Sequence, residues 1–145
     1  MKSDYNIFYT DDDKDDQDLF KSVIDEMNQS LSLHLHSTGD ELLHAIKNPP
    51  PRPSIVFLDL NMPEKNGFEV LKELRSYHYS KQTPVVIFST SDDSKAIAQS
   101  KDLGANMYVT KPESYEVLRG MVAHIISIDW ENFASSDKSF VYRHN

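Results

Sequence analysis

The sequence predicts an α/β fold in which a doubly wound parallel sheet of five strands carries helices on both faces. Short apolar runs alternate along the chain with longer segments whose apolar residues recur every three to four positions, which is the strand–helix order of a parallel sheet. Two of the runs, 55–58 and 85–88, are apolar throughout, as is typical of central strands covered on both faces. The chain has 145 residues, 39% hydrophobic and 26% charged, which fits one domain with one core.

The first half of the chain contains two predicted strands and two predicted helices. The second strand has leucines at alternate positions, which indicates one exposed face. The helices carry apolar side chains on one face, and a proline run ends the second of them. In order, these elements are the strand Ile7–Tyr9, the helix from Asp15 to Met27, the strand Leu31–His36, and the helix capped by Ser37 or Thr38 that ends before Pro49.

The second half of the chain contains three predicted strands and three predicted helices. The first two strands suit the centre of the sheet, and Gly104 ends the least apolar helix. In order, these elements are the strand Ile55–Leu58, a helix carrying Phe68 to Leu74, the strand Val85–Phe88, a helix over about Ser94 to Leu103, the strand Asn106–Thr110, and a helix carrying Leu118 to Ile126.

Composition excludes several classes of function. The net charge of −8 opposes nucleic-acid binding, which depends on Lys and Arg neutralising phosphates. No apolar run is long enough to cross a membrane, and the N-terminus lacks a secretory signal, so we expect a cytoplasmic protein. Because the chain has no cysteine, any metal must be held by oxygen or imidazole ligands.

Polar side chains gather where the predicted strands end. In a parallel sheet the functional crevice lies beyond the carboxyl ends of the strands, and the chain places Asp11–Asp13, Asp59, Ser89 and Lys111 there. Mg²⁺ prefers hard oxygen ligands and binds through one or two carboxylates, for which Asp12 and Asp59 are candidates. Asp59 ends the most apolar strand and is the candidate nucleophile for a phosphoryl group. Lys111 and Ser89 are candidates to contact the phosphoryl oxygens.

Four motifs at these strand ends resemble the receiver domains of bacterial response regulators. The motifs are Thr10-Asp11-Asp12, Phe57–Pro63 with Gly67, Phe88-Ser89-Thr90, and Tyr108–Pro112, and the resemblance covers about residues 5–128. It implies a flavodoxin-like sheet with strand order 2-1-3-4-5. We expect a single receiver domain, similar to chemotaxis regulators, over residues 1–130, and a C-terminal extension over 131–145 without a separate effector domain.

The resemblance implies a two-component phosphorelay function. Asp59 would accept a phosphoryl group from the phosphohistidine of a sensor histidine kinase, a class that includes phytochromes, or from a phosphotransfer protein. Mg²⁺ would be held by Asp12, Asp59 and the backbone carbonyl of Asn61, with Asp11 contributing through water.

The resemblance also implies a switch. Lys111 would clamp the phosphoryl group, Ser89 would move to hydrogen-bond it, and Tyr108 would turn inward and alter the surface of the last strand and its neighbouring helices. Serine stands at position 89 where threonine is frequent, which keeps the hydroxyl. The motif Lys111-Pro112 resembles the family's cis peptide, although a sequence does not reveal the isomer.

The expected output is phosphorylation-dependent protein binding with an unidentified target. The chain would be no enzyme beyond assisting its own phosphorylation and dephosphorylation. A homodimer is a further expectation, since similar single-domain receivers paired with phytochrome kinases dimerise through the last helix and a C-terminal extension. One alternative is a pseudo-receiver adaptor that works without phosphorylation. The other is an aspartyl-nucleophile phosphatase, against which Asn61 argues, because such enzymes place a general acid two residues after the nucleophile.

Simpler structural interpretations apply to other residues. The run Asp11–Asp13 permits a register error of one residue, although the strand pattern favours Asp11 and Asp12 as the pair. Asp15, Asp16 and Asp18 are expected to be a solvated first helical turn. His34 and His36 are expected on the exposed face of their strand. The aromatic tail, with Phe133 and Phe140, is expected to dock against the domain.

Overall fold

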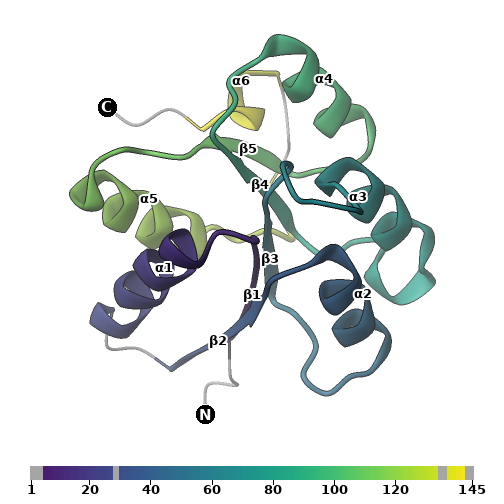
Figure 1. The fold of residues 1–145 in the computed structure, drawn as a ribbon, viewed down its shortest axis with the longest axis horizontal. Coiled ribbons are helices and arrows are strands. Elements are labelled where there is room, and N and C mark those ends of the chain that lie inside the picture. The colour runs from purple at the N-terminus through teal and green to yellow at the C-terminus, as the bar shows by residue number, and fades with distance from the viewer. Residues whose placement is uncertain (1–4, 28–29, 134–136, 143–145) are drawn as a thin grey trace.

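The computed structural model describes residues 5–27, 30–133 and 137–142, which fold into one parallel sheet between two layers of helices (Figure 1). The strands are β1 (Tyr5–Thr10), β2 (Leu31–His36), β3 (Ile55–Leu58), β4 (Val85–Ser89) and β5 (Met107–Thr110). Their order is β2-β1-β3-β4-β5, and every neighbouring pair is parallel. The predicted fold class and strand order are therefore confirmed.

The helices cover the two faces of the sheet. The helices α1 and α5 lie together on one face, and α2, α3 and α4 lie on the other (Figure 1). Within the described ranges none of them is long and apolar enough to cross a membrane. Their bounds are α1 (Lys14–Glu26), α2 (Gly39–Lys47), α3 (Gly67–Ser76), α4 (Ser94–Asp102) and α5 (Tyr115–Ser127), with two short helices, η1 (His78–Ser80) and α6 (Asp137–Phe140), that the sequence did not predict.

Polar side chains cap the helices that follow β1, β2 and β3. Asp13 accepts hydrogen bonds from the first amides of α1, and Thr38, rather than Ser37, caps α2. Asn66 and Glu69 form a reciprocal capping box at the start of α3. These caps hold the loops that follow β1, β2 and β3 in place, and two of those loops carry the acids of the predicted site.

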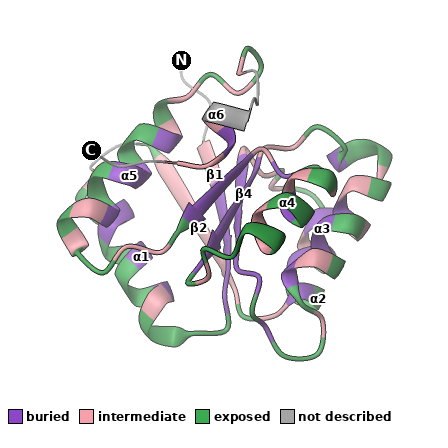
Figure 2. Cartoon of the chain, turned by 90° about the horizontal axis from the view of Figure 1, so that it is seen from above, coloured by how far each residue is buried: buried purple, intermediate pink, exposed green. Residues whose placement is uncertain are grey.

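Two apolar cores, and not the single core expected from the length, fill the spaces between the sheet and its helix layers, because the sheet separates them. The central strands β3 and β4 are buried along their length (Figure 2). The edge strand β2 departs from the prediction of one exposed face, because all six of its residues are half-buried. The rings of His34 and His36 each lie 5.2 Å from the ring of Phe8, and burial lowers the pKa of His36 to about 4. The expectation that both histidines simply face solvent was therefore wrong.

Candidate functional site

Three carboxylates converge at the carboxyl ends of β1 and β3. Asp11, Asp12 and Asp59 each offer an oxygen within 4.8 Å of the others; Asp11 and Asp59 are buried, whereas Asp12 is exposed. Backbone hydrogen bonds set this register, since the Asp59 amide donates to the carbonyl of Thr10 at 3.0 Å and the Asp11 amide to that of His36 at 3.0 Å. The structure thus brings together the acids that the sequence placed at the strand ends.

Lys111 enters this cluster from the end of β5. Its Nζ lies 2.7 Å from Oδ2 of Asp11, 2.8 Å from Oδ2 of Asp16 and 3.7 Å from Oδ1 of Asp59, and only 11% of the side chain is exposed. Burial alone would lower the pKa of Lys111, but the hydrogen bonds to Asp11 and Asp16 and the charge of Asp59 raise it overall. Lys111 is therefore a permanent cation among three carboxylates.

The contact with Asp16 corrects the sequence interpretation, which had placed this residue in a solvated helical turn. Because α1 begins at Lys14, Asp16 lies in its first turn, at the side of the helix that meets Lys111. Asp13 accepts hydrogen bonds from the amides of Asp15 and Asp16 and so caps α1. Asp11 and Asp12, and not Asp13, lie together with Asp59 in the carboxylate cluster.

Without a divalent cation, the surroundings of Asp59 let its carboxyl keep a proton to a higher pH than usual. Burial and then the charge of Asp11 raise the pKa of Asp59 to about 7, against the opposing effects of Lys111 and a backbone hydrogen bond from Asn61. A divalent cation between the carboxylates would remove this penalty. Asp12 and Asn61 are exposed beside the buried acids. Together these residues offer the oxygen ligands that Mg²⁺ prefers.

Two residues that hold Asp11 were not recognised from the sequence. The Tyr9 hydroxyl donates to Oδ2 of Asp11 at 2.9 Å, and Nε2 of Gln17 donates to the Asp11 carbonyl at 2.6 Å. The sequence indicates only a strand position for Tyr9, yet this residue stands two positions before Asp11 and therefore on the same side of β1. For Gln17, a buried polar residue of α1, the sequence carries no comparable signal.

The predicted switch residues lie on the last two strands: Ser89 is the last residue of β4, and Tyr108 is the second residue of β5. Ser89 is fully buried, and its Oγ accepts a hydrogen bond from the Ser91 amide at 3.2 Å. Tyr108 is also fully buried, and its hydroxyl donates to the Ser91 carbonyl at 2.7 Å. The tyrosine therefore occupies an inward position that is linked to Ser89 through a single residue.

The Lys111–Pro112 peptide bond differs from the one that the resemblance implied. Within residues 5–27, 30–133 and 137–142 the cis bonds are Pro49–Pro50 and Pro50–Pro51, so Lys111–Pro112 is trans. Trans is the isomer of lower free energy for a residue followed by proline. Lys111 reaches the carboxylates in this isomer.

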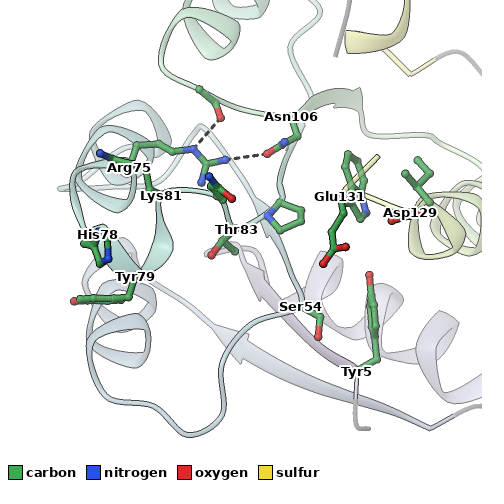
Figure 3. Close-up of a pocket in the computed structure, with 15 residues that line it drawn as sticks. Tyr5, Ser54, Arg75, His78, Tyr79, Lys81, Thr83, Asn106, Asp129 and Glu131 are labelled. Carbon is green, nitrogen blue, oxygen red and sulfur yellow. Dashed lines mark hydrogen bonds between the residues drawn. The ribbon is translucent and has the colours of Figure 1, made fainter. Parts of the chain in front are cut away.

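A cleft lies away from the acids, at the opposite ends of the strands (Figure 3). It has a volume of about 1240 Å³ and runs between the segment before β4 and the residues after α5. Arg75, on one wall, donates to the Gly104 carbonyl and to Oδ1 of Asn106, each at 2.9 Å, and burial lowers its pKa to about 10. The cleft therefore does not coincide with the carboxylate chemistry.

Gly67 lies against the loop that carries Asp59. A Cβ at position 67 would lie 2.5 Å from the Asp59 carbonyl oxygen and 2.7 Å from Cα of Leu60, so the loop would have to move. We expect Gly67→Ala to lower the free energy of unfolding by about 1–3 kcal/mol, measured by urea denaturation. Gly120→Ala, at an exposed position within α5, is the matched control and should instead raise it by up to about 1 kcal/mol. If Gly67→Ala left the free energy of unfolding unchanged, this would contradict the close approach of residue 67 to the Asp59 loop.

The comparisons with known proteins agree with this geometry. The family model of the response regulator receiver domain matches residues 7–123. Response regulator Rcp1 of Synechocystis sp. is 40% identical over 77 residues, which are 53% of this chain and 52% of Rcp1. Transcriptional regulatory protein CiaR of Streptococcus pneumoniae is 35% identical over 106 residues, which are 73% of this chain and 46% of CiaR. The matches thus span about half the length of these relatives.

Solved structures match over more of their length. The Mn²⁺-bound form of Rcp1 superimposes with a TM-score of 0.77 at 29% identity, covering 91% of this chain and 99% of that one. The phosphorylated cyanobacterial phytochrome response regulator RcpA gives a TM-score of 0.80 at 31% identity, covering 91% and 97%. The fold, the carboxylate cluster at the strand ends and these matches lead to one conclusion: the chain belongs to the response regulator receiver domains of two-component signalling.

Proposed function

We propose that this chain accepts a phosphoryl group on Asp59, with Mg²⁺, from the phosphohistidine of a sensor histidine kinase or a phosphotransfer protein. The observation that carries the proposal is the buried Asp59 carboxylate, placed within 4.8 Å of Asp11 and Asp12 and 3.7 Å from the Lys111 ammonium. A nucleophile, a metal-binding acid pair and a fixed cation are the parts that phosphoryl transfer to a carboxylate requires.

The reaction forms one bond and breaks one. An oxygen of ionised Asp59 attacks phosphorus, the phosphorus–nitrogen bond of the donor breaks, and the imidazole leaves with its electron pair and takes up a proton. Lys111 can turn from the carboxylates to the incoming phosphoryl oxygens, which keeps its charge paired throughout. Bound Mg²⁺, held by Asp12, Asp59 and the Asn61 carbonyl with Asp11 through water, would supply further positive charge for the phosphoryl oxygens.

Relatives support the metal and the donor class. The Rcp1 structure holds Mn²⁺, and RcpA is a phosphorylated phytochrome response regulator, so a phytochrome kinase is one candidate donor for this chain. The output would be a phosphorylation-dependent change of the surface around β5 that a protein target reads. A cytoplasmic location, a homodimer and a receiver over residues 1–130 with no effector in 131–145 belong to the same proposal; residues 1–4, 134–136 and 143–145 lie outside the described part of the chain.

We do not propose that the chain hydrolyses phosphate esters of other molecules. A phosphatase that used Asp59 as its nucleophile would need a general acid two residues later, and the amide of Asn61 is far too weak an acid for that role. A pseudo-receiver that binds partners without phosphorylation would not need the Lys111 cation held between Asp11 and Asp16. Both alternatives predict different outcomes in the experiment below.

Intact mass after incubation with acetyl phosphate tests the proposal. We expect a gain of one phosphoryl group that requires Mg²⁺ and is absent from Asp59→Asn. Asp12→Asn should abolish or strongly slow the gain, whereas Asp18→Asn, an exposed acid on α1, should leave it unchanged. No gain under any condition would favour the pseudo-receiver, and continued phosphate release without stable labelling would favour the phosphatase.

A further inference from the structure

The end of the described chain lies along the outer edge of β5. The Tyr142 amide donates to the Tyr108 carbonyl at 2.9 Å, and Val141 forms a parallel bridge with Tyr108. Figure 1 shows α6, directly before this bridge, beside β5 on the side of α4. We call Phe140–Tyr142 the tail segment; it extends the sheet past its last strand.

Aromatic side chains anchor the tail segment on both sides of that edge. Phe140 is 2% exposed and belongs to the same apolar core as Tyr108, next to α4, where Lys101 lies 5.9 Å from the centre of its ring. Tyr142 packs with the other core, and its ring lies 5.8 Å from that of His124 on α5. The tail segment therefore covers the α4–β5 face with one fully buried anchor.

The residue under the tail segment is the one that connects to the phosphorylation site. Tyr108 pairs with the tail segment through its backbone, while its hydroxyl holds the carbonyl of Ser91 at 2.7 Å. The Ser91 amide in turn donates to Oγ of Ser89. A movement of Ser89 toward a phosphoryl group would thus be transmitted to the strand on which the tail segment sits.

We propose that the α4–β5 face is a docking site for a short extended peptide carrying an aromatic anchor, and that the tail segment occupies it in cis until such a partner displaces it. The chemistry of the partner follows from the present occupant. A main-chain N–H pairs with the β5 edge and one aromatic ring fills the Phe140 position, which is the pattern of strand addition to a sheet edge. The further step, that phosphorylation changes the affinity of this face, rests on the proposed function.

In the wild type the tail segment competes with any added peptide for the α4–β5 face. A segment on a short tether has an effective concentration of the order of millimolar, so a free peptide binds poorly while the tail segment is bound. The probe is a fluorescent peptide of residues 137–145, titrated against the full chain with polarisation as the readout. We expect at least tenfold tighter binding to Phe140→Ala than to the wild type, and no binding of a peptide whose phenylalanine is alanine.

Controls separate the anchor from a general loss of structure. Phe133→Ala removes a ring of the same kind seven residues earlier, where it packs on Trp130, and should leave peptide binding as in the wild type. Where Phe140→Ala fails to fold, Tyr142→Pro, which removes the amide that pairs with Tyr108, carries the same expectation. Equal binding to wild type and both folded variants would overturn the proposal, and so would wild-type dimers that exchange their tails.

A separate measurement tests whether phosphorylation changes the affinity for the peptide. In Phe140→Ala, Mg²⁺ and acetyl phosphate should tighten peptide binding at least threefold. Phosphorylation is expected to hold Tyr108 inward, and inward is the position that Tyr108 has when the tail segment is bound. Phe140→Ala combined with Asp59→Asn should show no change. Full labelling by mass with unchanged affinity would overturn the coupling and leave the proposed function intact. No labelling would overturn the coupling together with the proposed function, while the docking site would stand or fall on the peptide titration alone.

Discussion

Asp59→Asn is expected to raise the free energy of unfolding of the metal-free protein by about 2–4 kcal/mol at pH 8. The carboxyl is 6% exposed, and burial and the charge of Asp11 raise its pKa to about 7, so holding it ionised in the folded state costs stability. An amide of the same shape carries no charge and removes that cost. Urea denaturation without Mg²⁺ measures the difference.

The stability of the wild type depends on pH through the proton of Asp59. An unfolded aspartate loses its proton near pH 4, whereas folded Asp59 keeps its proton up to about pH 7, so wild-type stability falls between these values as the pH rises. The gain from Asp59→Asn should therefore be small near pH 4 and complete above pH 7. Adding Mg²⁺ should stabilise the wild type and not the variant. Asp12→Asn, which removes an exposed carboxylate, should change stability by less than about 0.5 kcal/mol, and an equal gain there would contradict the argument.

Lys111→Met is expected to lower the free energy of unfolding by about 3–5 kcal/mol at pH 8. The change removes the cation that lies 2.7 Å from Asp11 and 2.8 Å from Asp16, and the Asp11 side chain is only 1% exposed. Breaking a buried ion pair leaves an uncompensated charge, which is more costly than the pair itself is stabilising. The variant should also lose phosphorylation by acetyl phosphate.

Lys14→Met is the matched control for this effect. Lys14 pairs with Asp18 at 2.8 Å, but both side chains are largely exposed, and exposed pairs contribute about 0–1 kcal/mol. The loss in Lys111→Met should be smaller at pH 5 than at pH 8, because burial and the charge of Asp11 raise the pKa of Asp59 to about 7, so that this neighbour of Lys111 is neutral at pH 5. Similar losses in the two variants, or a loss in Lys111→Met that does not change with pH, would sink the assignment of Lys111 as the buried cation of the site.

The fold and most of the site were predictable because they depend on local patterns. The runs 55–58 and 85–88 are apolar at every position, which indicates central strands without knowledge of their neighbours. In a parallel sheet the residue after each such strand must lie at one common edge, so Asp59 and Ser89 could be placed together from the sequence. The strand ends of β1 and β5 added Asp11 and Lys111 by the same argument.

The remainder depends on contacts between distant segments. Asp16 and Asp15 look alike in the sequence, and only the position of Lys111, ninety-five residues away, distinguishes them. The burial of His36 depends on how the helices beside β2 pack, which its alternating pattern does not reveal. Docking of the tail was expected, but its place on β5 follows from a bridge between Tyr108 and Val141 that no local pattern encodes.

The tail segment also has a consequence for how molecules meet at high concentration. Unpaired strand edges are the places where sheets of different molecules join into aggregates, and natural proteins guard them with charged residues or with covering segments. On one side of this sheet Val141 and Tyr142 cover β5. On the other side β2 reads Leu-Ser-Leu-His-Leu-His, with no lysine or acid among its six residues, and burial keeps His36 uncharged above about pH 4. Among the described residues β2 pairs only with β1, so its outer edge is where sheets of two molecules could join, and displacing the tail segment would add the edge of β5.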